Sequence, residues 1–217
     1  MTRFSLLKLY LKIEGEIINK KGLIIGVFVF FVLLYAGFFV YSLVKPSEND
    51  AIHITGEQIE TYKMSREYFD FYENISDEEI IDKILKGQII YNLSVEAGNI
   101  VTQEEIDSFA DSQKETMKQI EEAINRGEVD EQSILSYENQ LKYFEYLGMT
   151  FDEFFDFAKP TYEQLLYRGK LMEQLRAELS ETNEYNDSQE LEAAVKERLD
   201  KLVDDELKKI GDVVIDD

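Results

Sequence analysis

The sequence lacks cysteine altogether and has only two prolines and one histidine among its 217 residues. Without cysteine, the chain has no disulfide and no lipidated cysteine to hold it at a membrane, so packing must supply its stability. The single histidine, His53, has no histidine partner, and we interpret it as an incidental surface or core residue. Basic residues are also few, with 23 lysines and arginines against 45 acidic residues. The net charge of −22 argues against nucleic-acid binding, which needs a basic surface.

One long apolar run stands near the N-terminus of this acidic chain. It extends from Leu23 to Val44 without a charged residue. A helix rises about 1.5 Å per residue, so a run of about 20 apolar residues crosses a hydrocarbon core of about 30 Å. A cleaved secretory signal has a shorter apolar region that ends at small residues, whereas here Lys45 and Pro46 follow. We therefore predict an uncleaved transmembrane helix over residues 23–44.

Charge predicts the orientation of this helix. The residues before it are mostly basic, with only Glu14 and Glu16 of opposite sign, and positively charged flanks stay on the cytoplasmic side. The basic residues before the span are Arg3, Lys8, Lys12, Lys20 and Lys21. They either belong to an interfacial basic helix or act only as the flanking signal. We predict a single-pass plasma-membrane protein of Gram-positive bacterial type, with its N-terminus in the cytoplasm and its acidic C-terminal part outside.

The division of the chain follows from this topology. We predict a basic cytoplasmic tail over residues 1–22, the membrane helix over 23–44, a linker over 45–51 and one exterior domain over 52–217. With two prolines and few alternating strand patterns, the exterior domain is expected to be mainly α-helical. A short strand at Val213–Ile215 is expected to pair with Ile52–Ile54 and join the two ends of the domain.

Four capping boxes mark helix starts in the exterior domain. In a capping box, a Ser or Thr at the N-cap and a Glu or Gln three residues later satisfy each other's backbone N–H groups. The four pairs are Thr55 and Gln58, Ser76 and Glu79, Thr102 and Glu105, and Thr150 and Glu153. The predicted helices cover residues 56–73, 77–97, 103–126, 131–147, 151–179 and 188–210. Glycines 98, 127, 148 and 211 mark helix ends, and Pro160 is expected to kink or split the fifth helix.

Paired carboxylates are frequent, and such pairs can serve glycoside hydrolysis or bind a divalent metal. Adjacent residues on a helix point in different directions, however, so these pairs are expected to belong to solvated helix faces. The pairs and triplets in question are Glu78-Glu79, Glu104-Glu105, Glu121-Glu122 and Asp204-Asp205-Glu206. No phosphate-binding loop, calcium loop or nucleophile elbow is present in the sequence. We predict no catalytic residues, no cofactor and no metal, and an enzyme with an unrecognised acidic site is the weakest alternative.

Aromatic residues gather in two parts of the exterior domain. Most of them are expected in the core, since Phe151, Phe154 and Phe155 have the spacing of a core-facing helical stripe. Phe157 lies off that stripe. The others can line a groove, where large rings bind extended or partly folded chains at low entropic cost. The candidate client-binding residues are Tyr68, Phe69, Tyr72, Tyr143, Phe144, Phe151, Phe154, Phe155 and Phe157.

The stretch from His53 to Ser112 resembles the N-terminal chaperone domain of SurA and of the PrsA-type foldases. The resemblance is carried by a short strand with a G-x-x-I entry into a helix, here Gly56 and Ile59. It continues over Ile80–Ile106, which matches the pattern I-I-D-x-x-I, Q-x-x-Y/L, E-A and G-I-x-V-T-x-E-E-I. Later segments around Gly148 and near the C-terminus are similar to the same domain. The resemblance implies an α-helical SurA-like chaperone domain over most of the exterior part.

The chain also departs from those foldases. It has no segment with the length, the glycine-rich loops or the histidines of the parvulin prolyl isomerase domain, and the membrane helix replaces a lipoprotein cysteine. The resemblance then implies a membrane-tethered, ATP-independent holdase-type chaperone or assembly factor without prolyl isomerase activity. Its expected partners are unfolded or partly folded exported proteins. The alternative is a structural or regulatory module that binds one specific envelope protein.

Overall fold

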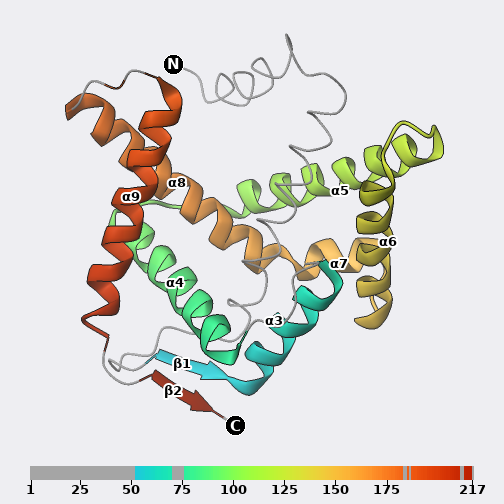
Figure 1. The fold of residues 1–217 in the computed structure, drawn as a ribbon, viewed down its shortest axis with the longest axis horizontal. Helices are drawn as coiled ribbons and strands as arrows, with labels where there is room; N and C mark the ends of the chain where they lie inside the picture. The colour runs from blue at the N-terminus through green and yellow to red at the C-terminus, as the bar shows by residue number, and fades with distance from the viewer. Residues whose placement is uncertain (1–51, 70–75, 183–184, 186, 211–212, 217) are drawn as a thin grey trace.

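The computed structural model describes residues 52–69, 76–182, 185, 187–210 and 213–216. Over these residues the protein is mainly α-helical, as predicted, with two short strands (Figure 1). The elements in chain order are β1 (Ile52–Thr55), α3 (Gly56–Phe69), α4 (Asp77–Glu96), α5 (Gln103–Asn125), α6 (Glu131–Tyr146), α7 (Phe151–Phe157), α8 (Lys159–Thr182), α9 (Ser188–Leu207) and β2 (Val213–Asp216). The predicted membrane span, Leu23–Val44, and the predicted linker lie outside the described residues. Among the helices that are described, none is both long enough and apolar enough to cross a membrane.

The four predicted capping boxes are confirmed. Thr102 is representative: its hydroxyl accepts a hydrogen bond from the Glu105 backbone N–H at 3.3 Å, and the Glu105 carboxylate accepts one from the Thr102 backbone N–H at 2.8 Å. Ser76 and Thr150 make the same reciprocal pair at the starts of α4 and α7. At the start of α3, the Gln58 amide oxygen accepts from the Thr55 N–H at 2.7 Å. Sequence alone therefore located these helix starts.

Loss of one capping side chain has a measurable cost. Thr150→Ala is expected to destabilise the protein by about 1 kcal/mol, because the Glu153 backbone N–H loses its acceptor. Thr116→Ala is the control: Thr116 is half-buried in the interior of α5, away from any N-cap, where alanine is the better helix former. Urea unfolding followed by circular dichroism measures both. Equal effects of the two substitutions would contradict the assigned N-cap.

Three helices end in the same turn, at glycines that the sequence marked as helix ends. Gly98, Gly127 and Gly148 have positive φ angles of 81°, 66° and 67°, a backbone conformation that residues other than glycine rarely adopt. After each glycine the next residue donates its backbone N–H to a carbonyl five residues back, as Asn99 does to Ser94 at 3.1 Å. This arrangement is the Schellman motif. Gly211 lies outside the described residues.

Pro160 divides the predicted fifth helix in two. The helix α7 ends at Phe157, Ala158 is its C-cap, and α8 begins at Lys159. Proline lacks a backbone N–H, which is tolerated only in the first turn of a helix, so Pro160 takes the second position of α8. The helix α8 then continues to Thr182, beyond the predicted end at Leu179.

The two strands pair as predicted, and their orientation is parallel. Ile52 is opposite Val213 and Ile54 is opposite Ile215. The pair lies beside the start of α3 and brings the first and last described residues together (Figure 1). A chain that emerges from a membrane just before β1 would therefore have both ends of its exterior domain on the membrane side.

Among the residues that the structure describes, the apolar interior consists of three clusters. The first joins α5, α6, α7 and the start of α8, the second joins β1, α3 and the first half of α4, and the third joins α4, α8 and α9. The 24-residue helix α8 contributes Tyr162 to the first cluster and Leu171 and Leu175 to the third. It runs across the molecule toward α9 (Figure 1), so α8 ties the two halves of the domain together.

Candidate functional site

Four of the nine candidate client-binding residues are buried, which corrects the predicted role of their side chains. Tyr143 and Phe144 on α6 and Phe154 and Phe155 on α7 are exposed by only 0, 4, 1 and 2 %. The short turn at Gly148 folds α7 back onto α6, and the Phe144 and Phe154 ring centroids lie 4.0 Å apart. Burial raises the pKa of the Tyr143 hydroxyl above its usual value of 10.0. These four rings form core contacts, and a client in contact with the folded domain does not reach them.

The remaining candidates have different positions. Phe151 is half-buried and packs on the Phe155 ring, with centroids 5.0 Å apart. Tyr68 and Phe69 lie in the last turn of α3, which packs against α6. The fold therefore brings α3 and α6 together, although they are far apart in sequence (Figure 1). Tyr72 lies outside the described residues.

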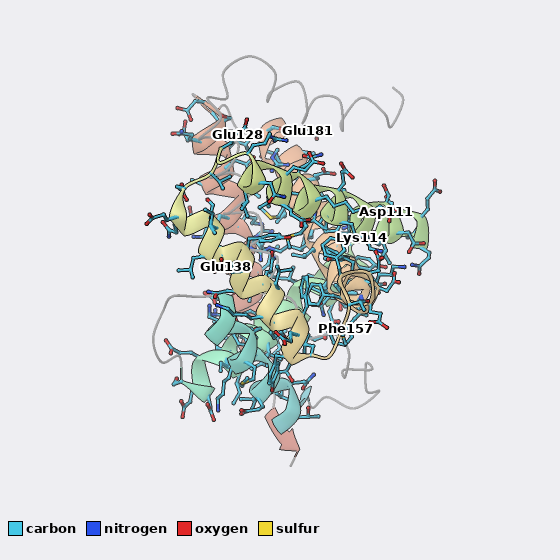
Figure 2. All side chains as sticks on the ribbon, turned by 90° about the vertical axis from the view of Figure 1, so that its right-hand side faces the viewer. Asp111, Lys114, Glu128, Glu138, Phe157 and Glu181 are labelled. Carbon is cyan, nitrogen blue, oxygen red and sulfur yellow. The ribbon has the colours of Figure 1, made fainter. Side chains whose placement is uncertain are left out.

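Phe157 is the one candidate whose side chain the structure describes as exposed. Its exposed fraction is 38 %, in agreement with its position off the stripe of Phe151, Phe154 and Phe155. Figure 2 views the side of the molecule formed by α5, α6 and α7 and labels Phe157 there. The helix α7 thus turns two phenylalanines inward and one outward, as its spacing predicted.

Three further exposed apolar side chains on α6 were missed by the sequence analysis. Leu135, Leu141 and Tyr146 are 42, 40 and 54 % exposed. They were missed because they are not separated from one another by three or four residues, the spacing of a helical stripe. Candidates on α6 were chosen instead where aromatic residues are frequent, at Tyr143 and Phe144. Spacing does not distinguish them, because Leu141 and Tyr146 stand three residues from the buried Phe144 and Tyr143.

We call these residues the α6–α7 outer surface: Leu135, Glu138, Leu141, Glu145, Tyr146 and Phe157. The described residues include six exposed large apolar side chains, and four of them belong to this surface. Single exposed apolar residues are normal on proteins, but a concentration on two successive helices indicates a contact site.

The acidic residues around this surface fall into two groups. On α7, Asp152 pairs with Lys114 at 3.3 Å and Asp156 pairs with Lys159 at 2.9 Å. The hydrogen bond from Lys159 lowers the pKa of Asp156. On α6, Glu138 and Glu145 are exposed and form no ion pair with any residue that the structure describes. The carboxylates that flank the exposed leucines are therefore available to an external cation.

A second exposed apolar feature occurs where α4 turns into α5. This corner is tied to α8, because the Ser94 hydroxyl donates to the Tyr167 carbonyl at 2.7 Å. The Asn99 side-chain amide donates to the Ser94 hydroxyl at 3.1 Å and to the Gln174 side chain at 3.5 Å. The turn is therefore held by a side-chain network rather than by local backbone bonds alone.

Lys170 completes the attachment of this corner. Its ammonium donates to the Ile100 carbonyl and to the Glu105 carboxylate, the latter at 2.9 Å. Partial burial raises the pKa of Glu105, but hydrogen bonds from Thr102 and Lys170 outweigh it and lower the pKa overall. Ile100 and Val95 project from this fixed corner, 72 and 45 % exposed. The corner is a small, rigidly held apolar feature.

The paired carboxylates are positioned as the sequence analysis expected, on solvent-facing helix surfaces. Glu78, Glu104, Glu121 and Asp204 are exposed, and Glu79 and Glu105 are occupied as capping-box residues. Among the described residues, no group of three or more acidic or histidine side chains is placed to hold a metal ion. His53 lies in β1.

No protein-family model, no curated protein and no solved structure matches this chain. The similarity of residues 53–112 to the SurA and PrsA chaperone domains therefore stays a prediction from the sequence.

Proposed function

We propose that the protein is a membrane-tethered, ATP-independent holdase-type chaperone or assembly factor for exported polypeptides. It has no enzymatic activity in this proposal, prolyl isomerisation included, and needs no cofactor. The observation that carries the proposal is the α6–α7 outer surface, where Leu135, Leu141 and Tyr146 on α6 and Phe157 on α7 are exposed, as are two glutamates of α6. Such a surface offers apolar contact to an unfolded segment and remains soluble when empty.

The mechanism would be reversible capture. An unfolded segment covers the exposed leucines and rings and so removes apolar surface from water, which is worth about 25 cal/mol per Å². A few exposed side chains provide modest affinity, so the segment leaves again without ATP. The acidic domain, in a chain of net charge −22, repels other copies of itself and limits co-aggregation of bound clients.

The predicted topology supports this mechanism. The linker over residues 45–51 reaches at most about 25 Å when fully extended, so it would hold β1 near the point where exported chains leave the membrane. A tether raises the local concentration of the capture surface at that point. The order of elements, from a first strand through helices to a last strand paired with the first, also suits the proposed SurA-like domain.

A second function is favoured by the corner between α4 and α5. Ile100 and Val95 are exposed on a turn that Lys170, Ser94 and Asn99 attach to α8. A rigid, small apolar feature suits one folded partner better than many unfolded ones. The alternative is therefore a structural or regulatory module that binds one specific envelope protein through this corner.

Breadth of binding distinguishes the two functions. The full chain in lipid nanodiscs is expected to suppress aggregation of several unrelated unfolded proteins without ATP, relative to empty nanodiscs. The double substitution Leu141→Ser and Phe157→Ser is expected to reduce this protection several-fold with little change in the melting curve, because both side chains are exposed. Ile100→Ser is the control on the other apolar feature.

One result would contradict the holdase proposal, and another would contradict the α6–α7 outer surface as its capture site. One is that the full chain protects no unfolded protein but binds one folded envelope protein stoichiometrically, with loss of binding in Ile100→Ser; that result supports the alternative function. The other is protection that is unaffected by the substitutions at Leu141 and Phe157, which would place the capture site elsewhere.

A further inference from the structure

Exposed apolar and acidic residues alternate along one face of α6, with the exposed Lys142 among them. Leu135, Glu138, Leu141 and Glu145 follow one another at intervals of three, three and four residues, and all four are exposed. At about 1.5 Å per residue, successive members are separated by about 4.5 to 6 Å along the helix axis. The row covers about three turns of α6. A partner of complementary chemistry must present apolar and basic side chains in the same alternation.

This spacing selects the conformation of the partner. An extended strand repeats the side chains of one face about every 6.6 to 6.8 Å. That repeat is longer than the separations of about 4.5 to 6 Å along α6, so a strand would not match the row. A helix repeats the side chains of one face every three or four residues, or about every 4.5 to 6 Å. That repeat matches the separations along α6. A helix that lies alongside α6 would therefore place each of its side chains opposite one member of the row, from Leu135 to Glu145.

The carboxylates of α6 favour a positively charged partner. Glu138 and Glu145 form no ion pair with any other residue in the described part of the chain, whereas Asp152 and Asp156 are already paired with lysines. Only Lys142 is basic among the residues of α6. Lysine or arginine on a docked helix would neutralise the two glutamates, and acidic helices would be repelled.

We propose that the α6–α7 outer surface binds basic amphipathic helices in exported polypeptides, with leucine-like side chains and lysine or arginine alternating on the docked face. This inference rests on the proposed function, since it names the class of client segment that the capture surface prefers. Apolar side chains of the helix contact Leu135 and Leu141, and the contact extends to Tyr146 at the end of α6 and to Phe157 on α7. Its cations pair with Glu138 and Glu145.

Other occupants fit this surface less well. A second copy of the chain carries the same net charge of −22 and would bring like charges together. An anionic lipid surface would be repelled by the same glutamates. A neutral apolar segment would fill the apolar positions but leave both carboxylates without a partner.

The test uses the full chain in nanodiscs of zwitterionic lipid. The probe is a fluorescent helical peptide of about 18 residues with leucine and lysine alternating along one face, and it carries a photo-crosslinker. A second peptide has glutamate in place of each lysine. Binding to empty nanodiscs is subtracted. We expect the lysine peptide to bind at least tenfold more tightly than the glutamate peptide and to crosslink to α6.

Matched variants assign the charge effect to this surface. The double variant Glu138→Gln and Glu145→Gln is expected to weaken binding of the lysine peptide about fivefold, because two exposed ion pairs are lost. The control is Glu173→Gln with Glu181→Gln, which removes the same charge from exposed positions of α8. Figure 2 shows Glu181 at the far end of the molecule from Phe157. The control is expected to change binding less than twofold.

The possible failures are distinguishable. If the control variant weakens binding as much as the α6 variant, or if both peptides bind equally, the helix-binding proposal is overturned. If aggregation of unfolded proteins is still suppressed in that case, the holdase function stands without this client preference. If neither peptide binds and no unfolded protein is protected, both proposals fail together. Crosslinks confined to the corner at Ile100 would overturn the α6–α7 surface as the docking site.

Discussion

Phe154→Ala is expected to lower the free energy of unfolding by about 3 to 5 kcal/mol, the usual cost of removing a buried phenylalanine ring. The Phe154 side chain is 1 % exposed and lies between the rings of Tyr143, Phe144 and Phe155. Its loss opens a cavity at the point where α7 packs on α6. Urea unfolding of the full chain in detergent micelles, followed by circular dichroism, measures the change.

Phe157→Ala on the same helix is the control for this measurement. Its ring is partly exposed, so the expected cost is below about 1 kcal/mol. The pair of variants separates the core role of α7 from its surface role. If Phe157→Ala destabilised the protein as much as Phe154→Ala, the side of α7 that faces the core would be assigned incorrectly, and Phe157 would not belong to a binding surface.

The second large effect is the digestion of the chain by external protease, which tests the predicted topology. We expect the digestion of the acidic part to be complete or absent, depending on the side of the membrane on which it lies. Protease added outside protoplasts is expected to digest the acidic part of the chain, residues 46–217, and to spare the membrane helix with its short basic tail. The reason is the excess of lysine and arginine before Leu23, which predicts that this flank stays in the cytoplasm. Immunoblots against tags at the two termini report the result.

The controls for the topology experiment are simple. A cytoplasmic marker protein must survive in the same sample, and permeabilised protoplasts must expose both tags. The opposite pattern, with the C-terminal tag protected and the N-terminal tag removed, would overturn the orientation. It would also remove the basis for a function with exported polypeptides, because the capture surface would then face the cytoplasm.

Local features of the fold were predictable because they depend on residues close together in sequence. The capping pair Thr102 and Glu105, for example, needs only a hydroxyl and a carboxylate three residues apart to satisfy two backbone N–H groups. Gly98 needs only the absence of a side chain to adopt a positive φ angle. Pro160 lacks a backbone N–H and is tolerated only in the first turn of a helix, so a long predicted helix must divide there. The element bounds were therefore largely correct before the fold was known.

The functional surface was less predictable. Sequence density of aromatic residues suggested Tyr143, Phe144, Phe154 and Phe155 as contacts for a client, and all four are core residues. Leu135 and Leu141 are the exposed residues instead, on a helix whose inward face was not evident from spacing alone. Helical periodicity states which residues share a face, but it does not state which face meets another helix.

Composition, capping chemistry and glycine positions thus determine that the described part of the chain is helical and acidic and where most of its helices begin and end. They act through the backbone within a few residues, so no distant contact is needed to read them. Which face of α6 is buried depends on how α6 packs against α3, α5 and α7. The attachment of the α4–α5 corner depends on Lys170, which is distant in sequence. These choices are made by packing between segments far apart in the chain, and only the tertiary structure records them.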